Sequence, residues 1–310
     1  MRRTTIVSVV AALVMAVLVM ADQSRADVYR YRLSGNWTTV TDGTSEGWGL
    51  NPNNDGSPGI GLPGAADDAR INWGGNTVTV DTAITGVSKV QIGVDESGNV
   101  VVESGGVLTG NRVYAGHNNA NATGTLTVND GGIVNVGDIL WAANNDSDGL
   151  IDINSGGVVT VGSHLWWGVS GTATIDISGS ITQTGGILGL GTSNASTPGG
   201  GTATVNVLDG GLLALNNISS ADGLPSIQPG SLLNIIGTGQ VTVPNDFVGV
   251  LTDYAIADKL AGNGVPGLSN LVIDFDITNP GFTTVTTIPE PSTLLLLGLG
   301  LGGVLIRRRR

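Results

Sequence analysis

The polar run at positions 144–149, Asn144-Asn145-Asp146-Ser147-Asp148-Gly149, places side-chain oxygens at its first, third and fifth positions and Gly at its sixth. This spacing matches the opening of a calcium-binding loop, in which oxygens hold the ion and Gly makes the sharp turn. The twelfth position, however, is Ser155 and not a bidentate Glu. Asn, Asp and Gly are also favoured in turns, so we expect Asn144, Asp146 and Asp148 to form a plain turn, with calcium binding as the alternative.

Three tryptophans, Trp141, Trp166 and Trp167, are the candidates for contact with sugar rings. Trp141 and Trp166 are 25 residues apart and occupy equivalent places in the repeat described below. If exposed, they form a platform for a carbohydrate; if buried, they are a column of core or interface residues.

The two histidines, His117 and His164, lie 47 residues apart, near the starts of their repeat units. Two units of such a repeat separate side chains by about 10 Å, which is too far for one shared metal ion. We therefore expect surface or corner roles. The chain contains no Cys, which excludes disulfides, thiol catalysis and Cys-ligated metal sites.

Acidic pairs are the remaining candidates for catalysis: Asp67-Asp68, Asp95-Glu96, and Asp274 with Asp276. Adjacent residues of a strand face opposite sides, so the first two pairs do not converge. No nucleophile elbow, phosphate loop or dinucleotide fingerprint is present in the sequence. We predict a protein without catalytic residues or a cofactor, while hydrolysis by two carboxylates from different repeat units stays open.

These residues lie on a repeat that begins near position 90. An apolar opening recurs, and its fourth residues are separated by 23, 27, 25 and 23 positions. Each opening precedes a polar turn and a strand with alternating apolar residues, and most units close with a Gly pair. The openings begin at Val90, Val113, Leu140, Leu165 and Leu188, and the Gly pairs begin at Gly105, Gly131, Gly156 and Gly210.

A unit of about 25 residues cannot bury its own apolar face, so neighbouring units must stack. The 50 Gly residues suit the corners at which the chain changes direction. We predict an all-β fold, a right-handed parallel β-helix, with a β-sandwich as the alternative. No stretch shows the helical periodicity that a leucine-rich repeat would need.

The flanks of the repeat predict caps. We expect an N-terminal cap and first strands over 27–85, with Trp37, Trp48 and Trp73 packing on the first rung, and β-helix repeats over 86–217. Residues 218–287 would form the last rungs and a C-terminal cap. Within them, 254–260 is expected to be one helical turn and 283–287 a linker.

Charge excludes one class of partner. Between Asp27 and Thr287, called the body below, six basic and 23 acidic residues give a net charge of −17. Neutralising phosphates requires clustered Lys and Arg, so we expect no nucleic-acid partner.

The N-terminus predicts a signal peptide over 1–26. The basic pair Arg2-Arg3 precedes an uncharged run over 6–21, which is short for a permanent membrane span. Small residues place the cleavage after Ala26, with cleavage after Ala21 or an uncleaved anchor helix as alternatives.

The C-terminus has three parts: Ile288-Pro289-Glu290-Pro291, an apolar run over 294–306, and Arg307, Arg308, Arg309 and Arg310. The arginines would remain cytoplasmic, which places the body outside. Residues 288–310 resemble the PEP-CTERM sorting signal of bacteria that carry an exosortase. The resemblance implies transient membrane insertion through a C-terminal transmembrane helix, recognition and cleavage near Pro289, Glu290 and Pro291 by an exosortase-type enzyme, and delivery to the surface or to extracellular polymer. An ordinary tail anchor is the alternative.

The repeats over about 60–215 also resemble those of exported, autotransporter-like β-helix proteins. Together these features predict a non-enzymatic scaffold or adhesin of the cell surface, outer envelope or extracellular matrix. The alternative is a β-helix protein that binds or degrades polysaccharide.

Overall fold

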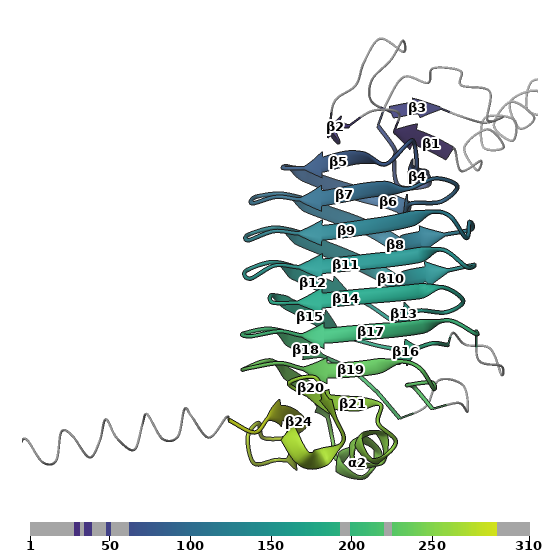
Figure 1. The fold of residues 1–310 in the computed structure, drawn as a ribbon. Helices are drawn as coiled ribbons and strands as arrows, with labels where there is room; N and C mark the ends of the chain where they lie inside the picture. The colour runs from purple at the N-terminus through teal and green to yellow at the C-terminus, as the bar shows by residue number, and fades with distance from the viewer. Residues whose placement is uncertain are drawn as a thin grey trace, which may run out of the picture.

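The chain winds into a coil of short strands. The structure, a computed structural model, describes residues 28–31, 34–38, 48–50, 62–192, 199–219 and 225–289. In these residues the strands stack into a β-solenoid of about 7 turns. Figure 1 shows one sheet running to the left in front and the other returning to the right behind as the chain descends, which makes the coil right-handed. The predicted β-helix is confirmed, and the sandwich is excluded.

The front sheet contains one strand from each rung, and its pairing is parallel from β2 to β21. Its strands, in spatial order, are β2 (Gly35–Asn36), β5 (Asn76–Val80), β7 (Gly98–Val102), β9 (Thr123–Val128), β11 (Asp148–Ile153), β14 (Thr172–Ile177), β17 (Thr202–Val207), β19 (Leu232–Ile235), β21 (Leu260–Gly262) and β22 (Val265–Pro266).

The rear sheet is bent where the middle rungs cross it in two segments. The register of β10 against β8 shifts between Val136 and Ile139, and the two halves of β10 pair with separate strands, β12 and β13. The strands are β3 (Trp48–Leu50), β1 (Val28–Tyr31), β4 (Asp68–Ile71), β6 (Ala83–Ile92), β8 (Val107–His117), β10 (Ile133–Asn144), β12 (Val158–Val161), β15 (Ser180–Gln183), β18 (Leu212–Ala214), β20 (Gln240–Pro244), β24 (Phe282–Thr287) and β23 (Leu271–Phe275), with β13 (Leu165–Trp167) and β16 (Leu188–Leu190) on the second half.

Alternation within each strand builds the core. In the front sheet, the register aligns Val100, Leu126, Ile151 and Ile175 on successive rungs, and all four are fully buried. The intervening residues point outward, as expected for strands with a period of two. The predicted repeat is therefore in register: the first residues of its five openings, from Val90 to Leu188, align rung on rung.

The Gly pairs turn the chain between the two sheets. Gly131 has φ of 72°, which side chains rarely adopt, and a Cβ on Gly132 would lie 2.6 Å from the carbonyl oxygen of Val102 on the preceding rung. The first Gly thus supplies the left-handed conformation, while the second allows close approach of neighbouring backbones.

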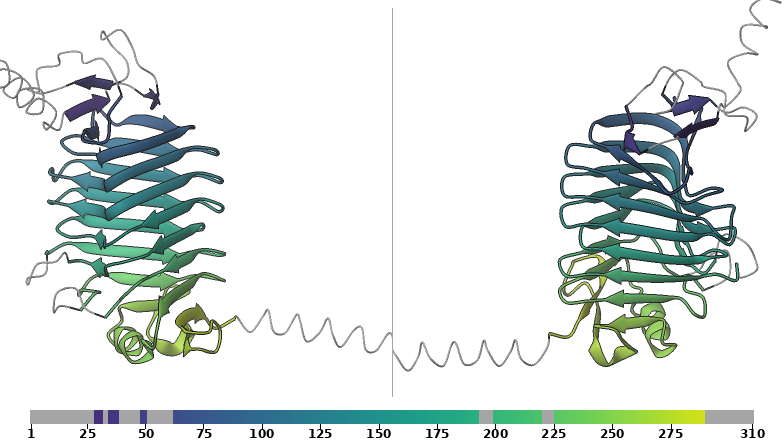
Figure 2. Two further views of the ribbon diagram at one scale, coloured as in Figure 1. Left: turned by 180° about the vertical axis from the view of Figure 1, so that it is seen from behind. Right: turned by 45° about the horizontal axis from the view of Figure 1, so that its top comes forward.

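Each end of the coil is covered (Figure 2). At the N-terminal end Trp37 and Trp48 are buried, their rings are 4.6 Å apart, and the Trp48 indole donates a hydrogen bond to the Trp37 carbonyl. The prediction was wrong for Trp73, which lies in the turn between β4 and β5 and is 48% exposed.

At the C-terminal end, the cap is more ordered than the sequence suggested. A helix, α2 (Val248–Ile256), replaces the single turn expected over 254–260, and a 3-10 turn, η1 (Leu268–Asn270), precedes β23. Strand β24 runs antiparallel to both β20 and β23. The predicted linker over 283–287 is therefore wrong: it is a cap strand, and Val285 within it is fully buried.

Candidate functional site

The junction between the body and the C-terminal segment begins at the end of β24. The Thr287 hydroxyl donates a hydrogen bond of 2.6 Å to the Gly237 carbonyl, and the Ile288 N–H donates one of 2.9 Å to the Asn270 carbonyl. The side chain of Ile288 is 43% exposed. The chain is thus held by the body up to Ile288, immediately before the first proline of the Pro-Glu-Pro sequence.

A pocket of about 440 Å³ lies at this junction. It is lined by two turns of the body, through Gly237, Thr238 and Asn263, and by the chain over 286–289. Pro289 is the only predicted processing residue that the structure describes. Ala26, Glu290, Pro291, Arg307, Arg308, Arg309 and Arg310 lie outside the described residues, as does the expected membrane helix over 294–306. In the described ranges, no helix is long and apolar enough to cross a membrane.

A second feature is a row of aromatic side chains on the outside of the rear sheet, the outer aromatic ladder of Tyr114, Trp141 and Trp166. The register aligns these residues on successive rungs. Tyr114 and Trp141 stack with their centroids 4.6 Å apart and their planes 9° apart. Trp141 also packs against the small apolar cluster around Trp166.

Stacking with neighbouring rings occupies the ring faces that a sugar would need. Trp166 is 2% exposed, His164 stacks on its ring at 4.7 Å, and a Cβ on Gly189 would lie 2.4 Å from the ring. Trp167 points to the other side and is fully buried in the core. Of the two outcomes left open for Trp141, Trp166 and Trp167, burial holds for Trp166 and Trp167, while Trp141 keeps partial exposure.

His117 lies beside this ladder at the corner after β8. Its ring is 4.7 Å from that of Tyr114, and its Nδ1 is 3.1 Å from the Asn144 amide nitrogen. Burial, and after it the charges of Arg70 and Lys89, lower the pKa of His117 to about 4, while the charge of Asp95 opposes them. A neutral imidazole that accepts a hydrogen bond from Asn144 fits these surroundings. His117 and His164 pack on different rings of the ladder.

The polar turn after β10 is a corner of the coil. The Asn144 side chain faces His117, while the Ser147 hydroxyl donates to the Asn144 carbonyl. Asn145 and Asp146 have φ of 56° and 64°, which Asn and Asp tolerate better than most residues. Asp146 and Asp148 are exposed, and within the described ranges no group of three or more His, Cys, Asp or Glu could hold a metal ion.

Two carboxylates from different rungs do meet on the front sheet. Asp152 and Asp176 are register partners, and the Asn206 amide donates a 2.8 Å hydrogen bond to Asp176. Burial and then the charge of Asp176 raise the pKa of Asp152. The pair faces away from the aromatic ladder. The predicted pairs Asp67-Asp68 and Asp95-Glu96 bind other groups. Asp68 forms an ion pair with Lys89, Asp95 forms one with Arg30, and Glu96 accepts a hydrogen bond from the Gly74 N–H.

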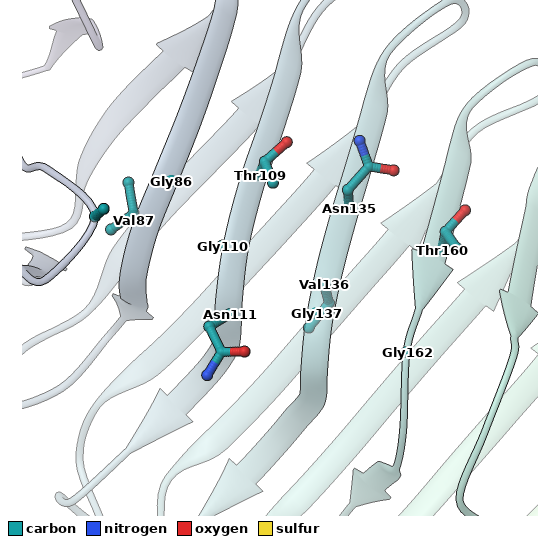
Figure 3. Close-up of a pocket in the computed structure, with 11 residues that line it drawn as sticks. Gly86, Val87, Thr109, Gly110, Asn111, Asn135, Val136, Gly137, Thr160 and Gly162 are labelled. Carbon is teal, nitrogen blue, oxygen red and sulfur yellow. The ribbon is translucent and has the colours of Figure 1, made fainter.

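A groove crosses the rear sheet at its bend. Figure 3 shows Thr109, Asn135 and Thr160 side by side on neighbouring strands, with Gly110, Gly137 and Gly162 beside them. The groove has a volume of about 330 Å³, and its lining residues in the described part of the chain are uncharged.

Sequence reasoning missed a strip of positive charge. Four of the five basic residues in the described ranges lie on the outside of the rear sheet near its N-terminal end, and we call them the cationic strip: Arg30, Arg70, Lys89 and Arg112. Arg30 and Arg70 are register partners, as are Lys89 and Arg112. In sequence, successive members of the strip are 19 to 40 positions apart, so only the rung register brings them together.

Comparison with known proteins identifies the C-terminal segment. Residues 287–310 match the family model described as the PEP-CTERM protein-sorting motif. Neither a curated protein nor a solved structure matches the chain significantly. The matched segment begins at Thr287, the last residue of β24. The chain thus carries a PEP-CTERM sorting motif on a β-solenoid scaffold, which makes it an exported protein sorted to the cell envelope by an exosortase.

Proposed function

We propose that the mature protein is a non-enzymatic scaffold or adhesin of the cell surface or extracellular matrix. The observation that carries this proposal is the junction: β24 closes the coil and passes directly into the sorting motif. A rod fixed through its C-terminal cap would present its long, acidic sides and its N-terminal end to the surroundings. Such a role requires a stiff body and no catalytic centre.

The proposal includes the two terminal steps expected from sequence. A signal peptide is removed after Ala26, and the apolar segment over 294–306 inserts transiently into the membrane until the exosortase acts near Pro289, Glu290 and Pro291. Because hydrogen bonds hold the chain to the body up to Ile288, the residue after β24, the enzyme would act on the residues that directly follow the cap.

Mass spectrometry of the protein recovered from the cell surface tests this function. We expect an N-terminus at Asp27 and a C-terminus within 289–291. The processed C-terminus should be found only in cells that contain the exosortase. A Glu290→Ala variant should retain the apolar segment and accumulate in the membrane, while Asn263→Ala, beside the junction, controls for a local disturbance. An intact Arg307 to Arg310 tail on the surface form would contradict the proposal.

Polysaccharide binding is a second candidate, favoured by the uncharged groove of Figure 3. Thr and Asn side chains on its rim offer hydrogen bonds to sugar hydroxyls. A pull-down with neutral glycans should then weaken when Asn135 and Thr160 are changed to Ala, and undiminished retention would contradict this role. Trp141→Ala provides a comparison outside the groove.

A further inference from the structure

Exposed apolar side chains gather at the C-terminal end of the coil, the lower end in Figure 1. Ten large hydrophobic side chains are exposed in the part of the chain that the structure describes, and six of them lie over 256–288. Single exposed apolar residues are common on proteins, whereas a concentration of them marks an interaction site. Ile277 is one of the six and follows β23; we call the other five the cap surface: Ile256, Val265, Leu268, Val272 and Ile288.

The end of α2 and the turn at η1 bring three of these residues together. Ile256 is the last residue of α2 and is 67% exposed. A Cβ on Gly267 would lie 4.0 Å from the Ala255 carbonyl oxygen, so the chain after β22 passes directly beside the end of the helix. Leu268 follows Gly267, and Val265 precedes it by two residues. These side chains therefore occupy one small region of the cap.

The other two residues of the cap surface lie where β23 meets β24. The Ile288 N–H donates a 2.9 Å hydrogen bond to the carbonyl of Asn270, which is two residues after Leu268. Val272 is the register partner of Thr286. Paired residues of a sheet point to the same side, as do residues two apart on one strand, so Val272 and Ile288 share a side. The cap surface thus extends from the end of α2 to Ile288.

The sequence that follows limits how far this surface can lie from a membrane. The apolar run begins at Leu294, six residues after Ile288. Six residues span at most about 22 Å, and the headgroup layer on one side of a bilayer takes up about 5–8 Å of this length. When the run is inserted, Ile288 is therefore within about 15 Å of the headgroups. Because Ile288 belongs to the cap surface, this part of the body is held closest to the lipid.

The charges around the cap surface indicate which lipid it fits. Asp253 and Asp258 are exposed in the same cap. Lys259 is the only basic residue over 225–289, and its amine donates to the Ile227 carbonyl. Segments that bind anionic lipids are rich in Lys and Arg, which is the opposite composition. Contact with lipid would therefore depend on apolar burial among neutral headgroups and not on charge.

From this arrangement we infer that the cap surface lies in the headgroup layer of a bilayer of zwitterionic lipid while the sorting segment is inserted. The body then stands on its C-terminal cap and binds lipid itself, as a second contact beside the inserted segment. This contact would keep the Pro-Glu-Pro sequence at the membrane surface until it is processed. The inference rests on the membrane insertion that is part of the proposed function.

Quenching of fluorescent labels by lipid tests the inference, because the chain has no Cys and one substitution places each label. The protein is purified from cells without the exosortase, which should retain the sorting segment. It is reconstituted in phosphatidylcholine vesicles that contain a lipid brominated near its headgroup. Labels at Ile256→Cys and Leu268→Cys should be quenched, since apolar faces at the interface reach about 5–10 Å into it. Ile133→Cys is the matched control, 37% exposed on the side of the coil, and should not be quenched.

Two further variants separate the cap surface from the inserted segment. A label at Leu297→Cys reports on the insertion and should be quenched. Leu268→Asp should remove most of the quenching of the Ile256→Cys label and leave that of Leu297→Cys unchanged, because it adds a charge to the cap surface alone. Ile133→Asp should change neither, and equal melting temperatures verify the fold of both Asp variants. High salt should leave the quenching in place, since the contact does not depend on charge.

Three results would overturn the inference. If the Leu297→Cys label is quenched while Ile256→Cys and Leu268→Cys behave as the Ile133→Cys control, the insertion stands and the cap does not touch lipid. If the Leu297→Cys label is not quenched either, the proposed insertion fails and the inference fails with it. If the cap labels shift to the blue without quenching, the cap surface contacts protein, such as a second copy of the chain, and not lipid.

Discussion

Gly116 and Ala143 occupy the same corner of successive rungs, and both have positive φ, 81° and 57° respectively. Gly93 and Gly168 hold the equivalent places on other rungs, with φ of 69° and 66°. The corner therefore imposes a left-handed conformation that Ala143 alone meets with a side chain. The free-energy cost of a side chain at this corner can therefore be measured by adding one at Gly116 and by removing the one at Ala143.

Gly116→Ala should lower the free energy of unfolding by about 2 kcal/mol or more, because the conformation is strained for Ala and the new Cβ would lie 2.1 Å from the Asp148 carbonyl oxygen. Urea unfolding of the full-length chain measures the change. Ala143→Gly is the matched control: relief of strain offsets the loss of a buried methyl group, so the change should stay within about 1 kcal/mol. Equal effects of the two substitutions would contradict this account of the corner.

Truncation separates the cap strand from the motif that follows it. A chain that ends at Pro289 should melt at the same temperature as the full chain, because it retains β24. A chain that ends at Gly281 loses the pairing to β20 and β23 and uncovers the rear sheet, so its melting temperature should fall by several degrees. Identical melting of the two truncated chains would show that β24 adds no stability.

The outer aromatic ladder predicts coupling between rungs. A double-mutant cycle with Tyr114→Ala and Trp141→Ala should give an interaction energy of about 0.5–1.5 kcal/mol, since the rings stack at 4.6 Å. Chemical denaturation of the four proteins provides the values. Additive losses would mean that the stacking contributes nothing beyond the burial of each ring.

Asp152→Asn should raise stability at neutral pH by a few tenths of a kcal/mol, because it removes the repulsion with Asp176 on a partly exposed sheet face. The folded state raises the pKa of Asp152, so the wild type regains this stability as pH falls and the carboxylate takes up a proton. The advantage of the variant should therefore vanish in acid. Thr127→Val, in the same column of the preceding rung, serves as a control without a charge change.

His117 predicts a loss of stability in mild acid. Its pKa is about 4 in the folded protein, whereas an unfolded His titrates near 6.5. The unfolded state therefore binds more protons between these values, and this contribution to stability declines as pH falls from about 6.5 to 4. Unfolding curves for the wild type and His117→Gln, measured across this range, should converge toward low pH. Curves that stay parallel would rule out the contribution.

Much of the body could be predicted because the repeat encodes its own register. The spacing of Val90, Val113, Leu140 and Leu165 fixed which residues share a column, and the structure pairs them in that way. Alternation placed the inward residues of the strands, while the Gly pairs marked the corners. These signals recur in most rungs, so a unit in which one signal is weak can be assigned from its neighbours.

The caps could not be predicted equally well, because each occurs only once. Residues 283–287 are rich in Thr and follow a Gly-containing turn, a composition shared by linkers and strands, and only their pairing with β20 and β23 decides between the two. Helix α2 begins after Phe247, whose side chain makes no capping hydrogen bond. The sequence therefore has no N-capping residue from which the start of the helix could be predicted. Trp73 was assigned to the cap by residue type, yet a turn leaves it half exposed.

The sorting motif of the candidate site could be predicted from the sequence, whereas the contacts between residues of different rungs could not. The Pro289-Glu290-Pro291 motif is local, and its type was evident from residues alone. The cationic strip and the pairing of Asp152 with Asp176 depend on which rung lies above which, and the lengths of the intervening turns determine that. The stacking of Trp141 on Tyr114 likewise follows from register, since Trp141 would be more exposed if its neighbour on the preceding rung were small.

The repeat also means that the length of the body depends on the number of its rungs. Each rung adds about 4.8 Å along the axis, and the caps lie at the two ends of the coil. Deletion or duplication of one unit of about 25 residues, such as 144–168, would therefore change the length of the body without altering either end. In the proposed surface-attached form, the number of rungs would set how far the N-terminal end stands from the cell.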